Sequence, residues 1–305
     1  MTNQITPTEG QVAQVKDLLG AAIRKSGVSK DGMDLLIGNG GVFQDRILPI
    51  IQDLGGITPN PYEKEVTNRT CGYPTGWTVP TFDEQLERTA KMYPDLVLPE
   101  ITNRDIVVPG GWDGIWWFPP KIAAIGRICA VADPYVADYG TVVKHLLALI
   151  GQQRDFTNYR TQDSDQLTAD YIRINELVRG RIQTLESATE GDFLPPMPIT
   201  FGQFYGGFSP RNARETSIRR QELPFCTAYV ASLLGIMPER LVAYEDIWID
   251  VPGDEYNWDA GGSWTNSLCF GFGDGRLKLY ARDAGSACGR CGSVVGSPGV
   301  LELVA

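Results

Sequence analysis

One stretch decides the fold of the C-terminal part of this chain: Leu268-Cys269-Phe270-Gly271-Phe272-Gly273-Asp274-Gly275-Arg276-Leu277-Lys278-Leu279-Tyr280-Ala281-Arg282. Residues 268–272 are typical of a strand. Residues 276–282 alternate, with Leu277 and Leu279 on one face against Lys278 and Tyr280 on the other. The Asp-Gly pair between the two runs tolerates positive φ and favours a tight turn. The stretch therefore predicts an antiparallel hairpin with one apolar and one polar face.

Helical patterns dominate the chain before this hairpin. Apolar residues recur at three- and four-residue spacing over residues 8–25, 135–152 and 164–187, which predicts three amphipathic helices. Thr81 can cap a further helix over 81–93, because Glu84 three residues later completes a capping box.

The Pro- and Gly-rich residues 191–207 predict a break, which we interpret as a domain boundary. This interpretation gives a mainly helical region over 1–190 and a mixed module over 191–305 whose end is rich in β-structure. The predicted fold class is α+β, with helices and strands segregated along the chain.

The composition of the chain limits the partners and the cellular locations that we expect. The 305 residues carry 27 Lys and Arg against 37 Asp and Glu, a net charge of −10, which argues against nucleic acid as the main partner. No apolar run is long enough to span a membrane. The N-terminus shows no secretory signal, so a cytoplasmic location is the default, with export by a non-standard route left open.

Few residues offer catalytic chemistry. His145 is the single histidine and sits in an apolar helical pattern, where a packed residue is the commoner outcome. Every Ser-His or Cys-His mechanism has to use it, and no Gly-x-Ser-x-Gly motif accompanies it. The sequence therefore favours a protein that is not an enzyme.

The main exception is the pair Cys288 and Cys291, which forms a single Cys-x-x-Cys motif. Such a pair can supply half of a zinc site or a redox couple, although most lone pairs of this kind do neither. Cys226 and Cys269 are distant in sequence but are available to complete a set of four sulfurs. A zinc- or thiol-dependent protein is thus one alternative function.

Two further clusters allow alternatives. The carboxylates of Asp246, Asp250, Asp254, Glu255 and Asp259 supply the hard oxygen ligands of a calcium site, against the simpler interpretation of a solvated loop. Residues 112–118 are rich in tryptophan, which favours a core or domain interface. Exposed, the same patch would suit a structural or assembly protein. We expect no cofactor, with zinc and calcium as the alternatives.

Residues 244–256 (YEDIWIDVPGDEY), 270–277 (FGFGDGRL), 291–293 (CGS) and 23–29 (IRKSGVS) resemble uncharacterised proteins abundant in candidate-phyla (Patescibacteria) genomes. The resemblance is strongest over residues 240–295.

A looser resemblance comes from Gly261-Gly262-Ser263-Trp264. This segment is similar to one in the C-type-lectin-like fold of formylglycine-generating enzymes and of the variable proteins of diversity-generating retroelements. The resemblance implies a C-terminal C-type-lectin-like module in which the residues after this segment form a variable, ligand-facing surface. The implied ligand-binding residues are Trp264, Thr265, Asn266, Leu268, Phe270, Phe272, Lys278, Tyr280, Arg282, Ser286 and Arg290.

The chain departs from that family in two ways. Gly292-Ser293 stands where the family ends in Gly-Phe-Arg, and Cys288 and Cys291 are three residues apart where the enzymes space their active cysteines by five. The resemblance thus implies the binding branch of the fold and not its enzyme branch. The expected function is a non-enzymatic protein that presents a C-terminal surface, retroelement-diversified in such relatives, to a protein or glycan ligand.

Overall fold

A computed structural model describes residues 9–30, 32–34, 60–98 and 108–298. The chain divides into two compact units, residues 1–59 and residues 60–305. In the first unit the predicted helix over residues 8–25 is confirmed as α1 (Glu9–Lys25). The remaining elements belong to the second unit.

The helices of the second unit, in chain order, are α4 (Phe82–Met92), α5 (Ile122–Ile128), α6 (Tyr139–Gln153), α7 (Glu176–Ser187), α8 (Pro210–Arg219), α9 (Thr227–Ile236) and the single turn η1 (Pro238–Arg240). The capping box predicted for α4 is confirmed. The Thr81 hydroxyl accepts from the Glu84 N–H, and the Glu84 carboxylate accepts from the Thr81 N–H at 2.7 Å.

The strands are β1 (Ile115–Trp117), β2 (Phe156–Asn158), β3 (Ile172–Ile174), β4 (Met197–Gly206), β5 (Leu223–Pro224), β6 (Trp248–Asp250), β7 (Asp254–Tyr256), β8 (Asn266–Gly273), β9 (Arg276–Asp283) and β10 (Cys291–Gly296). They form one mixed sheet with the path β1-β4-β10-β6-β8-β7-β3, while β9 joins β8 to β2 and β5 pairs with β10. Helices and a large mixed sheet make the second unit α+β, as predicted. The expected segregation along the chain is wrong, because β1, β2 and β3 lie before residue 190 and alternate with helices.

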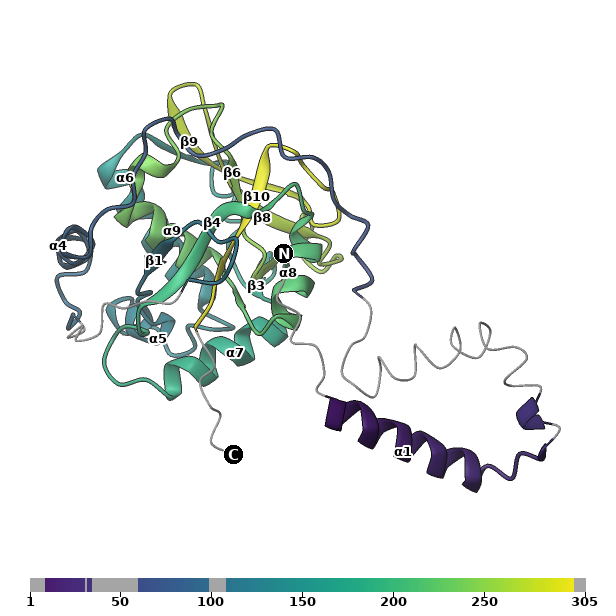
Figure 1. Ribbon diagram of the computed structural model, residues 1–305. Helices are drawn as coiled ribbons and strands as arrows, with labels where there is room; N and C mark the ends of the chain where they lie inside the picture. Colours follow the sequence, from purple (N-terminus) through teal and green to yellow (C-terminus); the bar gives the residue numbers. More distant parts are fainter. Residues whose placement is uncertain (1–8, 31, 35–59, 99–107, 299–305) are drawn as a thin grey trace. The chain divides into compact units, whose positions relative to one another are not determined.

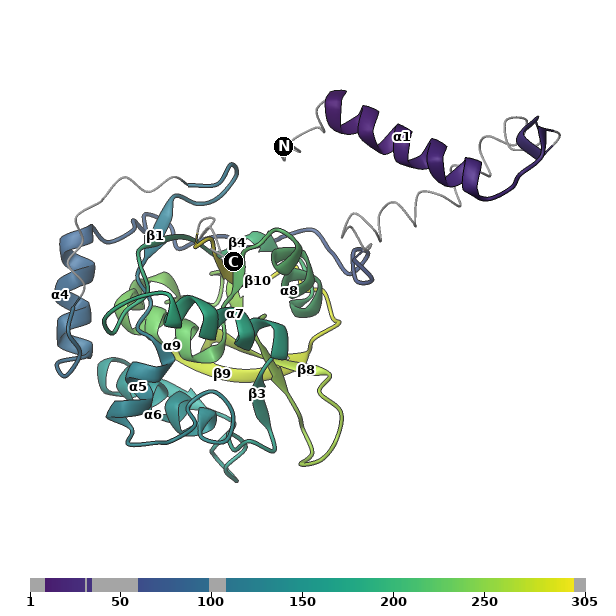
Figure 2. The same cartoon turned by 90° about the horizontal axis from the view of Figure 1, so that it is seen from below.

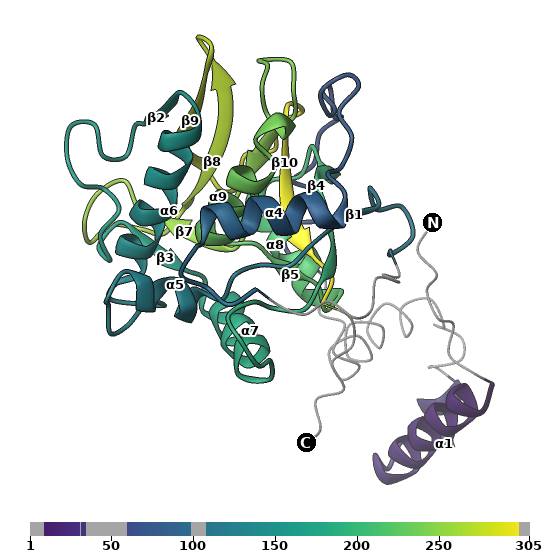
Figure 3. The ribbon, with the colours of Figure 1, turned by 90° about the vertical axis from the view of Figure 1, so that its left-hand side faces the viewer.

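Helix α9 lies at the centre of this unit. All ten of its residues are buried, because α6 and α4 pack against it and its sequence is apolar all round. Figure 3 shows α4 lying across α9, and Figure 2 shows α5, α6, α7 and α9 gathered against the sheet. The core continues from α9 into the inner face of the sheet through Phe225, Phe270 and Val294.

The hairpin predicted from residues 268–282 is confirmed as β8 and β9 (Figure 1). Gly273 pairs with Arg276, so Asp274 and Gly275 form a two-residue loop with φ of 53° and 75°. Both φ values are positive, as this tight turn requires. Leu277 and Leu279 are buried in the core, so the predicted split between the two faces of β9 is also confirmed.

The prediction of one helix over residues 164–187 is wrong in its first half. Residues 172–174 form β3, whose Ile172 and Ile174 are buried while Arg173 is exposed. Asn175 then caps α7 by accepting from the Leu177 N–H. Leu167, Tyr171 and Ile174 matched the helical spacing of three and four by coincidence, and pairing with β7 decides for a strand.

The break predicted over residues 191–207 also differs from the structure. Residues 197–206 form β4, which pairs with β1 on one side and β10 on the other. The strand hydrogen bonds therefore cross the predicted boundary near residue 190, and the division of the chain falls between Pro59 and Asn60 instead. In the described part of the chain, no helix is both long enough and apolar enough to cross a membrane.

Candidate functional site

The sheet carries a second face whose side chains are polar or aromatic. Register places Asp250 of β6 opposite Cys269 of β8, and Cys269 opposite Tyr280 of β9, while the Trp248 ring of β6 lies against Gly271 of β8. The parallel partner β10 adds Cys291 and Ser293 next to β6. Because paired residues project to the same side, these side chains all lie on the face that points away from the core.

Four aromatic rings from three segments of the chain form a continuous row along this face. Tyr159 stacks on Tyr280 with 5.3 Å between ring centroids, and Tyr280 stacks on Trp248 at 5.6 Å with planes 3° apart. Tyr244 meets Trp248 edge to face at 5.9 Å. We call these four residues the aromatic row. Tyr244 is 51% exposed and the other three are half-buried, so the row reaches the surface.

Gly271 makes the row possible. Strand β8 lies between β6 and β9, so the Trp248 ring has to cross β8 to reach Tyr280. A Cβ on Gly271 would lie 2.7 Å from the indole Cδ2 atom, well inside van der Waals contact. The absence of a side chain at this position thus lets the ring lie flat over the strand.

Cationic side chains flank both ends of the row. The Arg290 guanidinium lies 4.2 Å from the Tyr244 ring centroid and donates to the Tyr244 carbonyl at 2.8 Å. At the other end the Lys278 ammonium lies 6.0 Å from the Tyr159 ring centroid and forms an ion pair with Asp274. Cations over ring faces hold the terminal rings in place.

A buried polar cluster lies beside the row. Asp250 is fully buried and accepts two hydrogen bonds from Arg282 Nη1, at 3.0 and 2.9 Å. Arg282 also donates to the Ser286 carbonyl, which fixes the loop before β10. Burial raises the pKa of the Cys269 thiol, so this neighbour of Asp250 stays protonated.

The thiols of Cys288 and Cys291 meet at the edge of this cluster. The turn between them is closed by the Cys291 N–H, which donates to the Cys288 carbonyl at 3.1 Å, and the two sulfurs lie 2.7 Å apart. A hydrogen bond from Cys291, backbone N–H groups and the charge of Arg282 lower the pKa of Cys288 below its usual value. The same hydrogen bond and burial raise the pKa of Cys291.

The structure distributes the predicted ligand-binding residues over both faces of the hairpin and the loops around it. Lys278, Tyr280 and Arg282 lie on the polar face of β9, and Ser286 and Arg290 lie in the loop before β10. Trp264 is half-buried with the Arg173 guanidinium 4.2 Å from its ring centroid, and Thr265 is exposed. Asn266 is buried at the start of β8.

Three of the residues implied as ligand contacts belong to the core side instead. Leu268 and Phe270 are fully buried, and Phe272 is half-buried against the same core. Their register on β8 turns them away from Gly271 and the aromatic row, because successive strand residues face opposite sides.

The candidate metal ligands do not come together. Within the described ranges, no group of three or more His, Cys, Asp or Glu side chains is arranged to hold a metal ion. Four of the five carboxylates proposed for calcium are engaged by protein donors instead: Asp246 accepts from backbone N–H groups, Asp250 from Arg282, Asp254 from Tyr139, and Glu255 from Arg173 and Arg214. The fifth, Asp259, is exposed. Cys226 caps α9 in the core.

The tryptophan-rich patch forms core and not an exposed interface. Trp117 and Phe118 are fully buried, Trp112 is 8% exposed, and Trp116 stacks on Phe82. The alternative of a structural or assembly protein required this patch to be exposed, and the patch is buried.

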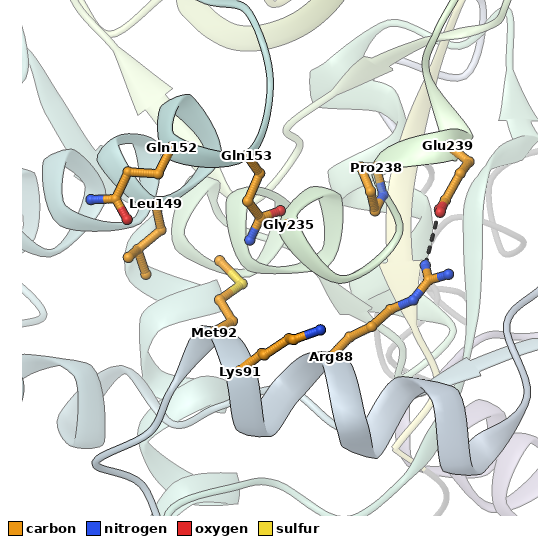
Figure 4. A pocket seen from close by; sticks show the side chains of 9 residues that line it. All are labelled: Arg88, Lys91, Met92, Leu149, Gln152, Gln153, Gly235, Pro238 and Glu239. Carbon is orange, nitrogen blue, oxygen red and sulfur yellow. Dashed lines mark hydrogen bonds and ion pairs between the residues drawn. The ribbon is translucent and has the colours of Figure 1, made fainter.

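A pocket of about 490 Å³ lies elsewhere, between α4, α6 and the end of α9 (Figure 4). Met92 and Gly235 lie in its wall, and an ion pair joins Arg88 to Glu239. It contains none of the residues predicted from the sequence and lies apart from the aromatic row.

Sequence reasoning missed Tyr159, Tyr244, Trp248 and Gly271. A signal existed for one of them: alternation in Ile247-Trp248-Ile249 places Trp248 on the opposite side from two isoleucines. Comparisons of the chain with protein-family models, curated proteins and solved structures find no match.

Proposed function

We propose that this chain is a non-enzymatic binding protein whose aromatic row contacts a protein ligand. The observation that carries the proposal is the stack of Trp248 of β6 on Tyr280 of β9, which Gly271 of β8 between them makes possible. Rings that support only the core would lie on the other face of the sheet. A half-exposed row with an arginine at its end has the residue types that dominate protein–protein binding energies.

The stacking favours a protein over a glycan. Sugars bind to open ring faces, whereas the faces of Tyr280 are occupied by Tyr159 and Trp248. The row offers ring edges, hydroxyl groups and the Arg290 guanidinium to a ligand. These groups suit the backbone carbonyls and mixed side chains of a protein surface.

The proposal includes a C-type-lectin-like module diversified on its polar side. Support comes from the pairing of β4 with β10, which brings the two ends of residues 197–296 together and closes the segment on itself. Exposed Thr265, half-buried Tyr280 and exposed Ser286 can change without touching the core. Diversification at these positions would alter the ligand while β8 and the buried side of β9 hold the fold.

A selection experiment tests the proposal. The full chain is used to select a displayed random-peptide library and, in parallel, to probe a glycan array. We expect peptide clones whose binding falls at least about tenfold with Tyr280→Ser, a typical hot-spot loss. Thr184→Ser on an exposed side of α7 is the matched control and should bind like the unaltered chain.

Peptides that bind equally well to the Tyr280→Ser chain would contradict the placement of the site. Binding to glycans alone, lost with the same substitution, would keep the site and reject the protein ligand. The substitution removes a half-buried ring, so the thermal midpoint of each variant is measured alongside.

A further inference from the structure

The Cys288 and Cys291 thiols, which we call the thiol pair, differ in access. Cys288 is half-buried, whereas Cys291 is 2% exposed at the start of β10. Their sulfurs lie 2.7 Å apart, in direct contact. A reagent in solution can therefore reach the Cys288 sulfur. The Cys291 sulfur is shielded from the reagent but can react with Cys288.

The surroundings of the thiol pair favour a negative charge on Cys288. The positive charge of Arg282 of β9 lowers the pKa of Cys288, and two hydrogen bonds to Asp250 of β6 hold the Arg282 guanidinium in place. The other titratable neighbours are the buried Asp250 carboxyl, which interacts electrostatically with Cys288, Cys269 of β8, whose pKa is raised by burial, and Cys291 itself, which donates to the Cys288 sulfur. The thiolate is the form of cysteine that attacks disulfides.

We propose that the thiol pair is a redox couple that exchanges with small-molecule disulfides, with Cys288 as nucleophile and Cys291 as resolving thiol. The Cys288 thiolate attacks one sulfur of a disulfide RSSR, forming a mixed disulfide and releasing RS⁻. The Cys291 sulfur then attacks the Cys288 sulfur and displaces the second RS⁻. Two electrons pass from the protein to RSSR, and the two thiol protons end on the two RSH products.

This activity is independent of the proposed ligand-binding function. The couple also adjoins the aromatic row, because Arg290 lies between the two cysteines in sequence and covers Tyr244. Strand β10 pairs Cys291 directly with Trp248.

Glutathione is the probe in the test. The full chain is equilibrated at pH 7 in mixtures of reduced and oxidised glutathione, quenched in acid, alkylated and mapped by mass spectrometry. We expect the peptide that contains Cys288 and Cys291 to lose two hydrogens as the mixture becomes oxidising. Cys291→Ser should trap one glutathione on Cys288, and Cys288→Ser should leave residue 291 without an adduct.

Cys129→Ser is the matched control, because Cys129 is a half-buried thiol whose pKa burial raises. It should oxidise at residues 288 and 291 like the unaltered chain. A dithiol that persists in fully oxidised glutathione, or glutathione that accumulates on Cys288 of the unaltered chain without an internal bond, would overturn the proposal.

A second measurement needs no variant and so does not depend on folding of the mutants. Iodoacetamide at pH 7 should label Cys288 at least about tenfold faster than Cys71 and Cys129, which have similar exposure. Equal rates at the three positions would also overturn the proposal.

Discussion

The indole ring of Trp248 lies parallel to the phenol ring of Tyr280, with centroids 5.6 Å apart, although strand β8 separates the strands that carry them. The contact exists because residue 271, between them on β8, is glycine. A local sequence feature on one strand therefore controls an aromatic contact between two others.

Gly271→Ala should destabilise the protein by about 1–3 kcal/mol, because the added methyl group overlaps the indole. The φ angle of Gly271 is not in the positive range, so the change introduces a clash without backbone strain. Urea unfolding followed by tryptophan fluorescence measures the loss.

Gly180→Ala on α7 is the control for that change, since a Cβ there meets nothing within 4 Å. Helix propensity predicts a gain of about 0.5–1 kcal/mol at this site. Equal effects of the two substitutions would mean that the Trp248 ring moves aside at no cost.

Substitutions in and beside the β8–β9 hairpin should differ in cost according to the burial of the side chain. Phe270→Ala removes a fully buried ring and should cost about 3–5 kcal/mol. Thr265→Ala and Ser286→Ala alter exposed side chains and should each stay within about 0.5 kcal/mol of the unaltered chain. Thermal or chemical unfolding of the three variants measures this, and a large loss at either exposed position would show that the variable surface is structural. An exchange of all residues over 265–290 would also replace the buried Phe270, so we expect that exchange to unfold the module.

Stability should depend on pH through Asp254. Burial raises the pKa of this carboxyl from 3.8 to about 7 in the folded protein. Between these values the folded state holds a proton that the unfolded state has lost, so stability falls as pH rises. The contribution of the protonated form is complete below pH 3.8 and is lost as pH rises to about 7.

Asp254→Asn keeps the shape of the carboxyl but cannot ionise, and its amide oxygen can still accept from the Tyr139 hydroxyl and from the Thr227 N–H. Its stability relative to the unaltered chain should rise by about 1.4 kcal/mol per pH unit between pH 4 and 7. Urea titrations at several pH values give this difference, with Asp259→Asn at an exposed carboxylate as control. A constant difference across the range would refute the raised pKa.

Arg240 should resist even a conservative change. Its guanidinium is fully buried, donates to the carbonyls of Phe201 and Ile247, and lies 4.3 Å from the Tyr73 ring centroid. Lysine cannot reproduce the planar fork, so Arg240→Lys should cost about 2–4 kcal/mol. Arg219→Lys, at a surface pair with Glu215, should cost under about 0.5 kcal/mol. Similar losses in urea unfolding would mean that a lysine satisfies the buried site.

Local signals in the sequence predicted the elements that neighbouring residues control. The Asp274-Gly275 turn and the Thr81–Glu84 capping box each depend on residues within four positions, and both are confirmed. The strands β3 and β4 were not predicted, because the strands that pair with them lie far away in the sequence. Ile172 of β3, for example, pairs with Tyr256 of β7, which is about 80 residues later. No local pattern reports a partner at that distance.

In the candidate site, too, the local sequence predicts some features and only the tertiary structure decides the others. The alternation of β9 determined that Lys278, Tyr280 and Arg282 share a face, because side chains in a strand alternate. Tertiary structure decided which residues contact them. The parallel pairing of β2 with β9 brings Tyr159 next to this face, and β6 supplies Asp250, which binds Arg282. The sequence determined which residues face together, whereas only the packing of distant strands decided which of them became a surface row and which became buried partners.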